Sequence, residues 1–343
     1  MRNFFIIIVI LLLVLSFGLV VFTRMIAPGI VRRQLGSSFG ETCAGCTLDI
    51  DRVHVSLVPV SVILEGVRMS GGDPKATAVD ARADRIIGRT SLCSMVLGRL
   101  VFRGIQVHAP HVVVTEGDLP LPSSNREQGK RRTFVIDGVE LIDGTFTYIR
   151  VFGTGEKTRK ATLHVKDVQA SVGKLGTVPS LLDQAVKGEA KGRLENSGNF
   201  LLAVETLLFS ELLNVDVDLQ MAEQNLVDVS QFFQTADGVR ISGILHEGRS
   251  SIKVRGKQLG GSARVKYDNL NVQFEKTKSR GAISTFFSNL IKSFKLNPSS
   301  LDEAATDRTG RVELEREAGE TLVLFILRGM KEAALKVAGM SQK

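Results

Sequence analysis

Alternation of apolar and polar residues with a period of two constrains the fold of this chain more than any other feature. The clearest example is the segment 213–221, whose apolar positions are Leu213, Val215, Val217, Leu219 and Met221 and whose intervening positions are Asn214, Asp216, Asp218 and Gln220. Successive side chains of a strand point to opposite faces, so this segment is expected to be a strand with one apolar face. That face must meet a packed layer or an apolar ligand.

Other segments share this spacing and are also expected to be strands. They are Val53/Val55/Leu57, Val60–Leu64 after Pro59, Val101–His108, Val112–Thr115, Ile252/Val254, Val265/Tyr267, Val272/Phe274, Val312/Leu314 and, after a turn at Gly319, Leu322–Leu327. Only short helices are expected, at 91–97, 226–233, 281–294 and 328–339. The strands follow one another in simple up-and-down order without βα units. This order predicts a mainly β chain and argues against a doubly wound nucleotide-binding fold.

The segment Phe4–Phe22 carries no charged residue. As a helix it would span about 28 Å, close to the thickness of one hydrocarbon core. It is longer than the apolar region of a typical cleaved signal peptide, and the following Thr23–Ile26 lacks an A-x-A pattern. We therefore expect an uncleaved transmembrane anchor, with a cleaved signal peptide as the alternative. No second apolar run has the length of a span.

Basic residues flank this segment on both sides. Arg2 precedes it, whereas Arg24, Arg32 and Arg33 follow it. Counted alone, these residues favour a cytoplasmic location for the remainder of the chain.

The composition excludes several classes of function. The chain has no Trp and only 2 Tyr, although it carries a net charge of +8, so it lacks the aromatic stacking surface of single-strand nucleic-acid binders. The basic runs at 131–132 and 157–160 are interpreted as solvated loops. No nucleic-acid partner is expected.

No arrangement of residues predicts catalysis, a metal site or a cofactor. The five histidines are scattered, and His108 and His111 would face opposite sides of a regular strand. The segment 153–158, GTGEKT, departs from the phosphate-loop pattern because Glu156 separates the glycine from the lysine. It is interpreted instead as a hairpin turn between strands at 146–151 and 161–165. The chain is not expected to be an enzyme.

Cys43 and Cys46 form a C-x-x-C motif, and Cys93 is the remaining cysteine. A zinc site would need further ligands, and a thioredoxin-type site would need the motif at the start of a helix in a βαβ unit. A local disulfide between Cys43 and Cys46 is the leading interpretation for an oxidising compartment, with free thiols and a redox catalyst as alternatives.

The N-terminal anchor, a short helix that ends in glycine, and three strand units together resemble the AsmA-like family of bacterial envelope proteins. The units are LDIDRVHVSLVPVSVILEGVRM (48–69), VFRGIQVHAPHVVV (101–114) and FVIDGVELIDGTFTY (134–148). The similarity is greatest to the short, single-span members that carry a domain of unknown function. It implies an inner-membrane anchor with the bulk of the chain in the periplasm, against the arginine count. No catalytic residue of the family carries over.

The resemblance also implies a long, curved, mostly antiparallel sheet with short helices, whose apolar concave side forms an open, taco-like groove. We expect the groove to bind or conduct phospholipid or another acyl-chain lipid in outer-membrane biogenesis, because larger members of the family are associated with phospholipid movement. The groove candidates are Val53, Val55, Leu57, Leu213, Val215, Val217, Leu219, Val265, Val272 and Phe274. A filled barrel is the structural alternative. A scaffold that pairs with envelope proteins through its sheet edges is the functional alternative.

The expected organisation follows from these assignments. The anchor occupies 1–24, a juxtamembrane helix 25–40, a first β segment 41–116, a linker or loop 117–132, the continuing β groove 133–278, and an amphipathic helix, a terminal hairpin and a C-terminal helix 279–343.

Overall fold

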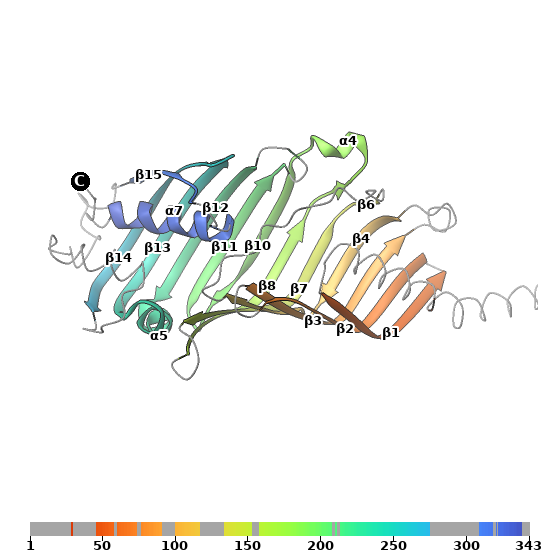
Figure 1. Cartoon of the computed structure of the whole chain (residues 1–343), viewed down its shortest axis with the longest axis horizontal. Helices are drawn as coiled ribbons and strands as arrows, with labels where there is room; N and C mark the ends of the chain where they lie inside the picture. The colour runs from red at the N-terminus through yellow and green to blue at the C-terminus, as the bar shows by residue number, and fades with distance from the viewer. Residues whose placement is uncertain are drawn as a thin grey trace, which may run out of the picture.

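The computed structural model describes residues 29, 46–57, 60–73, 77–90, 100–116, 134–152, 158–207, 210, 213–274, 309–317, 320 and 322–337. These residues form one large sheet of fifteen strands with few helices (Figure 1). The mainly β fold is therefore confirmed. The expected anchor, the juxtamembrane helix, the linker and the helices at 91–97 and 281–294 lie outside the described residues. Among the described helices, none has both the length and the hydrophobicity to cross a membrane.

The strands are β1 (Thr47–Leu57), β2 (Val60–Asp73), β3 (Thr77–Thr90), β4 (Leu100–His108), β5 (His111–Glu116), β6 (Phe134–Ile136), β7 (Val139–Phe152), β8 (Arg159–Val172), β9 (Leu175–Gly176), β10 (Val186–Leu194), β11 (Gly198–Thr206), β12 (Asn214–Asn225), β13 (Val239–Arg255), β14 (Gln258–Phe274) and β15 (Gly310–Glu315). The helices are α4 (Pro179–Leu182), α5 (Leu226–Asp237) and α7 (Leu322–Val337).

The strands lie in nearly the same order in space as in sequence. β4 continues into β5 along one side of β3, and β6 and β7 follow in line beside them. Likewise β8 and β9 follow in line beside β7 and β6. Fifteen strands thus occupy twelve positions, which at about 4.8 Å each give a sheet roughly 50 Å across. The pairings are antiparallel except β4–β6, β4–β7 and β5–β7, where the chain crosses over to run parallel.

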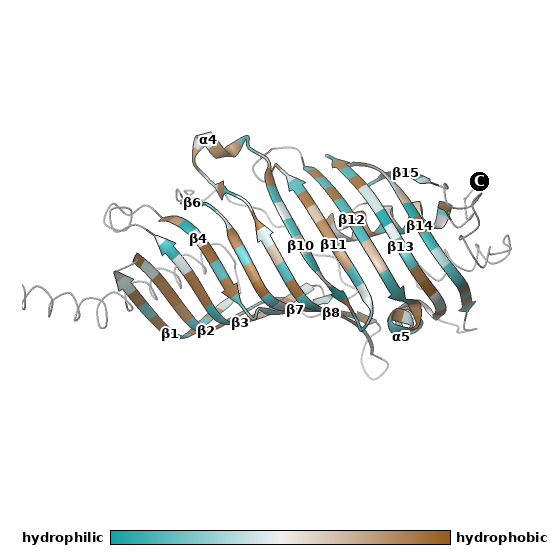
Figure 2. Cartoon of the chain, turned by 180° about the vertical axis from the view of Figure 1, so that it is seen from behind, coloured by the Kyte–Doolittle hydropathy of each residue, from teal (hydrophilic) through white to brown (hydrophobic). Residues whose placement is uncertain are grey.

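Strand registers bring the apolar residues of neighbouring strands onto one face of the sheet. Val217 lies opposite Val204 of β11 and Ile252 of β13, and Val53 lies opposite Leu64. This face, called the apolar face, includes Ile50, Val53, Val55, Val62, Leu64, Val79, Val107, Val112, Phe146, Leu163, Val172, Leu202, Val204, Val217, Ile252, Leu259 and Val312. The other face is mostly polar, with a few exceptions such as Ile87. The alternation is visible along the strands in Figure 2.

Residues with positive φ bend successive strands at the same level. Gly66 of β2, Ala109 between β4 and β5, Asp143 of β7 and Asp167 of β8 have φ of 61°, 47°, 55° and 54°. A Cβ at Gly66 would collide with the Asp51 side chain. Interruptions of this kind bend and twist strands. They divide the sheet into a first arm, which contains β4, and a second arm, which contains β5, joined along a crease.

Helix α5 takes the place of strands in the second arm between β8 and β13. The β10–β11 hairpin ends near the crease, and β12 ends at Asn225, whose side chain accepts a hydrogen bond from the Val227 N–H at 3.1 Å and caps the helix. Gly238 ends the helix in the left-handed conformation. α5 contacts both β8 and β13, so it closes the gap between them (Figure 1).

Helix α7 packs on the apolar face over β13, β14 and β15. Phe325 is fully buried there with Val217, Ile252, Leu259 and Ala333. The expected strand at Leu322–Leu327, and with it the terminal hairpin, is therefore wrong. Short apolar runs do not distinguish strand from helix by periodicity, and the buried positions of this segment follow the helical period when it is extended to Val337.

Candidate functional site

The groove candidates of β1 lie on the apolar face at the end of the sheet farthest from α7. Val53 and Val55 pair with Leu64 and Val62 of β2 and are half-buried. Leu57 continues this row in the backbone register, opposite Val60. The two longer described helices pack mainly against β8 and β12–β15. From β1 to β5, therefore, no described helix packs extensively on the apolar face, whereas at β7 Phe232 of α5 reaches Tyr148, with their ring centres 6.0 Å apart.

The candidates of β12 lie in a different environment. Val215 and Val217 are each 5% exposed and belong to the cluster beneath α7, with Leu213 packed against its edge. The expectation that these two valines line an open groove is corrected, because α7 occupies that part of the face. Helix α7 begins at Leu322, six residues earlier than the helix expected at 328–339, and therefore covers more of the sheet than expected.

The remaining candidates lie between these two environments or near the sheet edge. Leu219 and Val265 are half-buried on the apolar face of β12 and β14. Val272 is half-buried in β14 opposite Ile241, and Phe274 closes that strand opposite Val239. The structure does not bring all ten candidates together. It separates a set on β1 from a set that helix α7 partly covers.

A polar cluster interrupts the apolar face at the outer end of the second arm. The Tyr148 hydroxyl donates a hydrogen bond to the Glu116 carboxylate. Burial, then the hydrogen bond and the negative charge of Glu116, raise the pKa of Tyr148 above its usual range. The Arg150 guanidinium lies 4.8 Å from the centre of the Phe152 ring. All three polar residues of the cluster, Glu116, Tyr148 and Arg150, are half-buried.

Sequence reasoning missed this cluster. The signal was present, because Glu116 and Arg150 each follow an apolar run whose spacing places them on the apolar face. Residues at strand ends are usually solvated, so neither was selected. The pairing of Glu116 with Arg150 depends on the parallel register of β5 and β7, which local periodicity does not encode.

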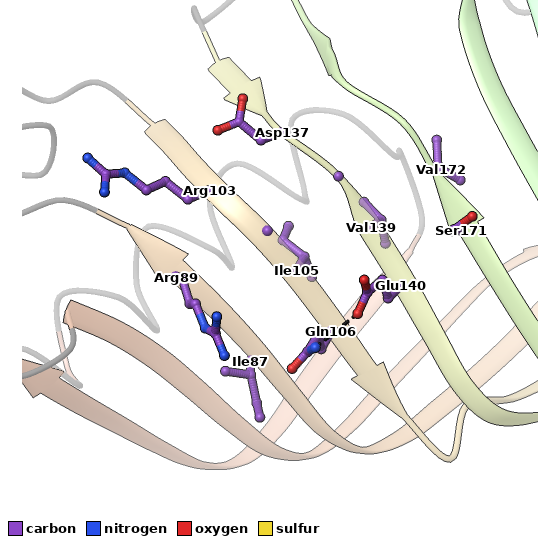
Figure 3. Close-up of a pocket in the computed structure, with 12 residues that line it drawn as sticks. Ile87, Arg89, Arg103, Ile105, Gln106, Asp137, Val139, Glu140, Ser171 and Val172 are labelled. Atoms are coloured by element: carbon purple, nitrogen blue, oxygen red, sulfur yellow. Dashed lines mark hydrogen bonds between the residues drawn. The ribbon is translucent and has the colours of Figure 1, made fainter.

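A shallow hollow of about 300 Å³ lies on the polar side of the sheet at the ends of β3, β4 and β7. Figure 3 shows Arg103 and Asp137 at its upper end, with Arg89 and the Gln106–Glu140 pair below them. Gln106 Nε2 donates to Glu140 Oε2 at 2.9 Å. The hollow is open and its charges are of both signs, so it resembles a hydrated surface depression more than a ligand pocket.

The histidines do not form a site. His108 and His111 both face the polar side, contrary to the expectation of opposite sides, because the bend at Ala109 interrupts the alternation between β4 and β5. His111 Nδ1 lies 2.6 Å from Thr145 Oγ1, and His164 pairs with Thr147 on the same side. Among the described residues no group of His, Cys, Asp and Glu could hold a metal ion.

Cys46 is disulfide-bonded and lies against Gly71 of β2. Cys43 and Cys93 both lie outside the described residues, so the Cys43–Cys46 pairing stays a prediction.

No protein-family model matches the sequence. No curated protein matches it with significance either.

Proposed function

We propose that this chain binds phospholipid or another acyl-chain lipid along the apolar face, with its N-terminal segment anchored in the bacterial inner membrane and its bulk in the periplasm. In this proposal the bent sheet is an open groove, and the protein serves envelope or outer-membrane biogenesis without catalysing a reaction. The carrying observation is the continuity of the apolar face, which runs from β1 to β15 through matched registers.

Two features of the groove support a lipid ligand. The apolar residues of β1–β7 are mostly half-buried valines, leucines and isoleucines, and no described helix seals them. Such a surface is costly to leave in water, at about 25 cal/mol per Å². At the other end, α7 and α5 close the groove, so a ligand would occupy the β1–β7 end.

The proposed location rests on the sequence of the N-terminal segment. Phe4–Phe22 has the length and hydrophobicity of one span. An oxidising compartment is also compatible with the disulfide at Cys46. Fusion of a reporter to the C-terminus tests this location, since export of Lys343 is required by the proposal and cytoplasmic reporter activity would contradict it.

The lipid proposal is tested with the full chain purified in detergent, washed free of loose lipid, and extracted for mass spectrometry. We expect phospholipid at a fixed ratio to protein. A Val55→Asp variant should lose most of that lipid, because the charge enters the apolar face, whereas His54→Asp on the polar side of the same strand is the matched control. Lipid at background level in the unchanged protein would contradict the proposal.

The sheet edges favour a second candidate, a scaffold or adaptor. Among the described strands, the eleven-residue strand β1 pairs with β2 and lies at an edge of the described sheet. Strand addition at a sheet edge is the way in which such a scaffold would recruit a partner. A protein captured by cross-linking at the polar side of β1, without lipid in the groove, would favour this function over lipid binding.

A further inference from the structure

The polar cluster at the outer end of the second arm has the chemistry of a headgroup site. We propose that Arg150 and Glu116 bind the phosphate and the primary ammonium of a zwitterionic phosphoethanolamine headgroup, while the acyl chains lie on the apolar face toward the crease. This inference rests on the proposed function, because it assigns the polar end of the same ligand.

The charged residues of this cluster occupy an unusual position on the apolar face. Between β1 and β8 the charged side chains that the structure describes on the apolar face are Glu116, Arg150 and Arg159, and they lie at the outer strand ends of the second arm. Charges at a rim are ordinarily exposed. Glu116 and Arg150 are instead half-buried, and Tyr148, two residues inward from Arg150, holds the Glu116 carboxylate through its hydroxyl.

The opposite charges of Glu116 and Arg150 do not neutralise each other. Glu116 and Arg150 are register partners on adjacent strands. Yet within the described part of the chain neither forms an ion pair, and the Arg150 guanidinium is instead placed over the Phe152 ring. A half-buried charge that has no opposite charge beside it is costly, even when it accepts a hydrogen bond as Glu116 does or lies over an aromatic ring as Arg150 does. A ligand that supplies both missing charges would relieve that cost.

The guanidinium and the carboxylate of the cluster match the phosphate and the ammonium of the headgroup. A guanidinium presents a planar fork of donors that fits phosphate oxygens, and a carboxylate accepts hydrogen bonds from an ammonium. Glu116 would repel an anionic headgroup that lacks an amine. The pair therefore selects a zwitterion over a purely anionic lipid, and a primary ammonium over a quaternary one that has no hydrogen to donate.

The apolar surface between the cluster and the crease is long enough for the acyl chains. From Glu116 back to His111 at the crease, β5 extends about 17 Å, slightly more than the roughly 15 Å of one leaflet's hydrocarbon. Val112, Val114 and Phe146 line this stretch on the apolar face. Phe232 of α5, whose ring centre is 6.0 Å from that of Tyr148, bounds it on the side of β8.

The experiment measures lipid retained by the full chain in detergent, with four probes: phosphatidylethanolamine, phosphatidylglycerol and diacylglycerol with identical acyl chains, and free phosphoethanolamine. The unchanged protein should retain phosphatidylethanolamine best. Arg150→Gln should reduce that retention about tenfold, the loss of one charge-assisted hydrogen bond, and Arg150→Lys should restore part of it. Glu116→Gln should abolish the preference over phosphatidylglycerol.

Lys160→Gln is the matched control, because Lys160 lies at the same outer end but on the polar side of β8. Melting temperature is recorded for each variant so that a loss of fold is recognised. Equal retention of phosphatidylethanolamine and diacylglycerol, or unchanged retention in a folded Arg150→Gln variant, would overturn the headgroup site and leave lipid binding intact. Binding of free phosphoethanolamine alone, with no probe that carries acyl chains retained, would instead overturn the proposed function and leave the cluster as a phosphate-and-amine site.

Discussion

Substitution of Val217 by aspartate tests whether α7 is firmly seated on the apolar face. Val217 is 5% exposed, faces Val204 and Ile252 across its strand, and lies in the cluster that contains Phe325. Loss of the valine contacts costs about 1.5–3 kcal/mol. A neutral polar group buried without a hydrogen-bond partner costs about 1–3 kcal/mol more as judged from protein variants, and an ionised carboxylate at this depth would have to take up a proton to keep its cost in that range. We expect a total loss of about 3–6 kcal/mol.

The assay is thermal unfolding followed by circular dichroism, combined with limited proteolysis of the α7 segment. Asp218→Asn provides the matched control, because Asp218 is exposed on the opposite face of the same strand, where such changes usually cost within about 0.5 kcal/mol. The Val217→Asp protein should melt well below the control and be cleaved within α7. If both variants melt together and α7 resists cleavage equally, the reasoning that places Val217 in a packed core is refuted.

Three further predictions follow from local geometry. Burial by itself raises the pKa of Glu320, but hydrogen bonds from Arg328 and from the backbone outweigh burial and leave the pKa lowered. The ionised Glu320 carboxylate therefore stabilises the fold above its unfolded-state pKa, and this stabilisation is lost as the pH falls through its folded-state pKa. A Glu320→Gln variant should show a smaller drop in melting temperature on acidification. Gly66→Ala should cost about 1–3 kcal/mol in denaturant unfolding because its φ is 61°, and an unchanged midpoint would argue against the crease. With the other tyrosine replaced by phenylalanine, absorbance titration should give Tyr148 a pKa above its usual range, and Glu116→Gln should lower that pKa; titration at an ordinary value would show that the cluster is open to water.

Periodicity along single strands predicted many of the strands, including β1 and β12 with their apolar faces, but it did not predict β10 or β11. The alternation from Leu213 to Met221 reappears in β12, whose register aligns it with β11 and β13. Periodicity could not predict what covers this face. The run at 322–327 reads as a strand when short and as a helix when extended to Val337, and tertiary packing of Phe325 decides between them.

The candidate site was predicted only in its apolar part. Val53 and Val55 lie on the apolar face as expected, because two-residue spacing survives anywhere within a regular strand. The Glu116–Arg150 pair could not be predicted, since it arises from a crossover that sets two distant segments parallel. The bends at Ala109 and Asp143 were also unforeseen, because residue type signals positive φ only weakly: Asp is enriched in this conformation, but most Asp residues do not adopt it, and Ala is not enriched.

Because the strands lie in nearly the same order in space as in sequence, the number of strands sets the width of this sheet. The β10–β11 hairpin pairs with β8 and β12 through regular antiparallel registers and stops near the crease. Removing or duplicating such a hairpin would shorten or extend the sheet by about 10 Å while leaving the handedness and facing of every other strand unchanged. The width of the sheet, from β1 at one end to the strands under α7 at the other, is therefore set in increments of one hairpin.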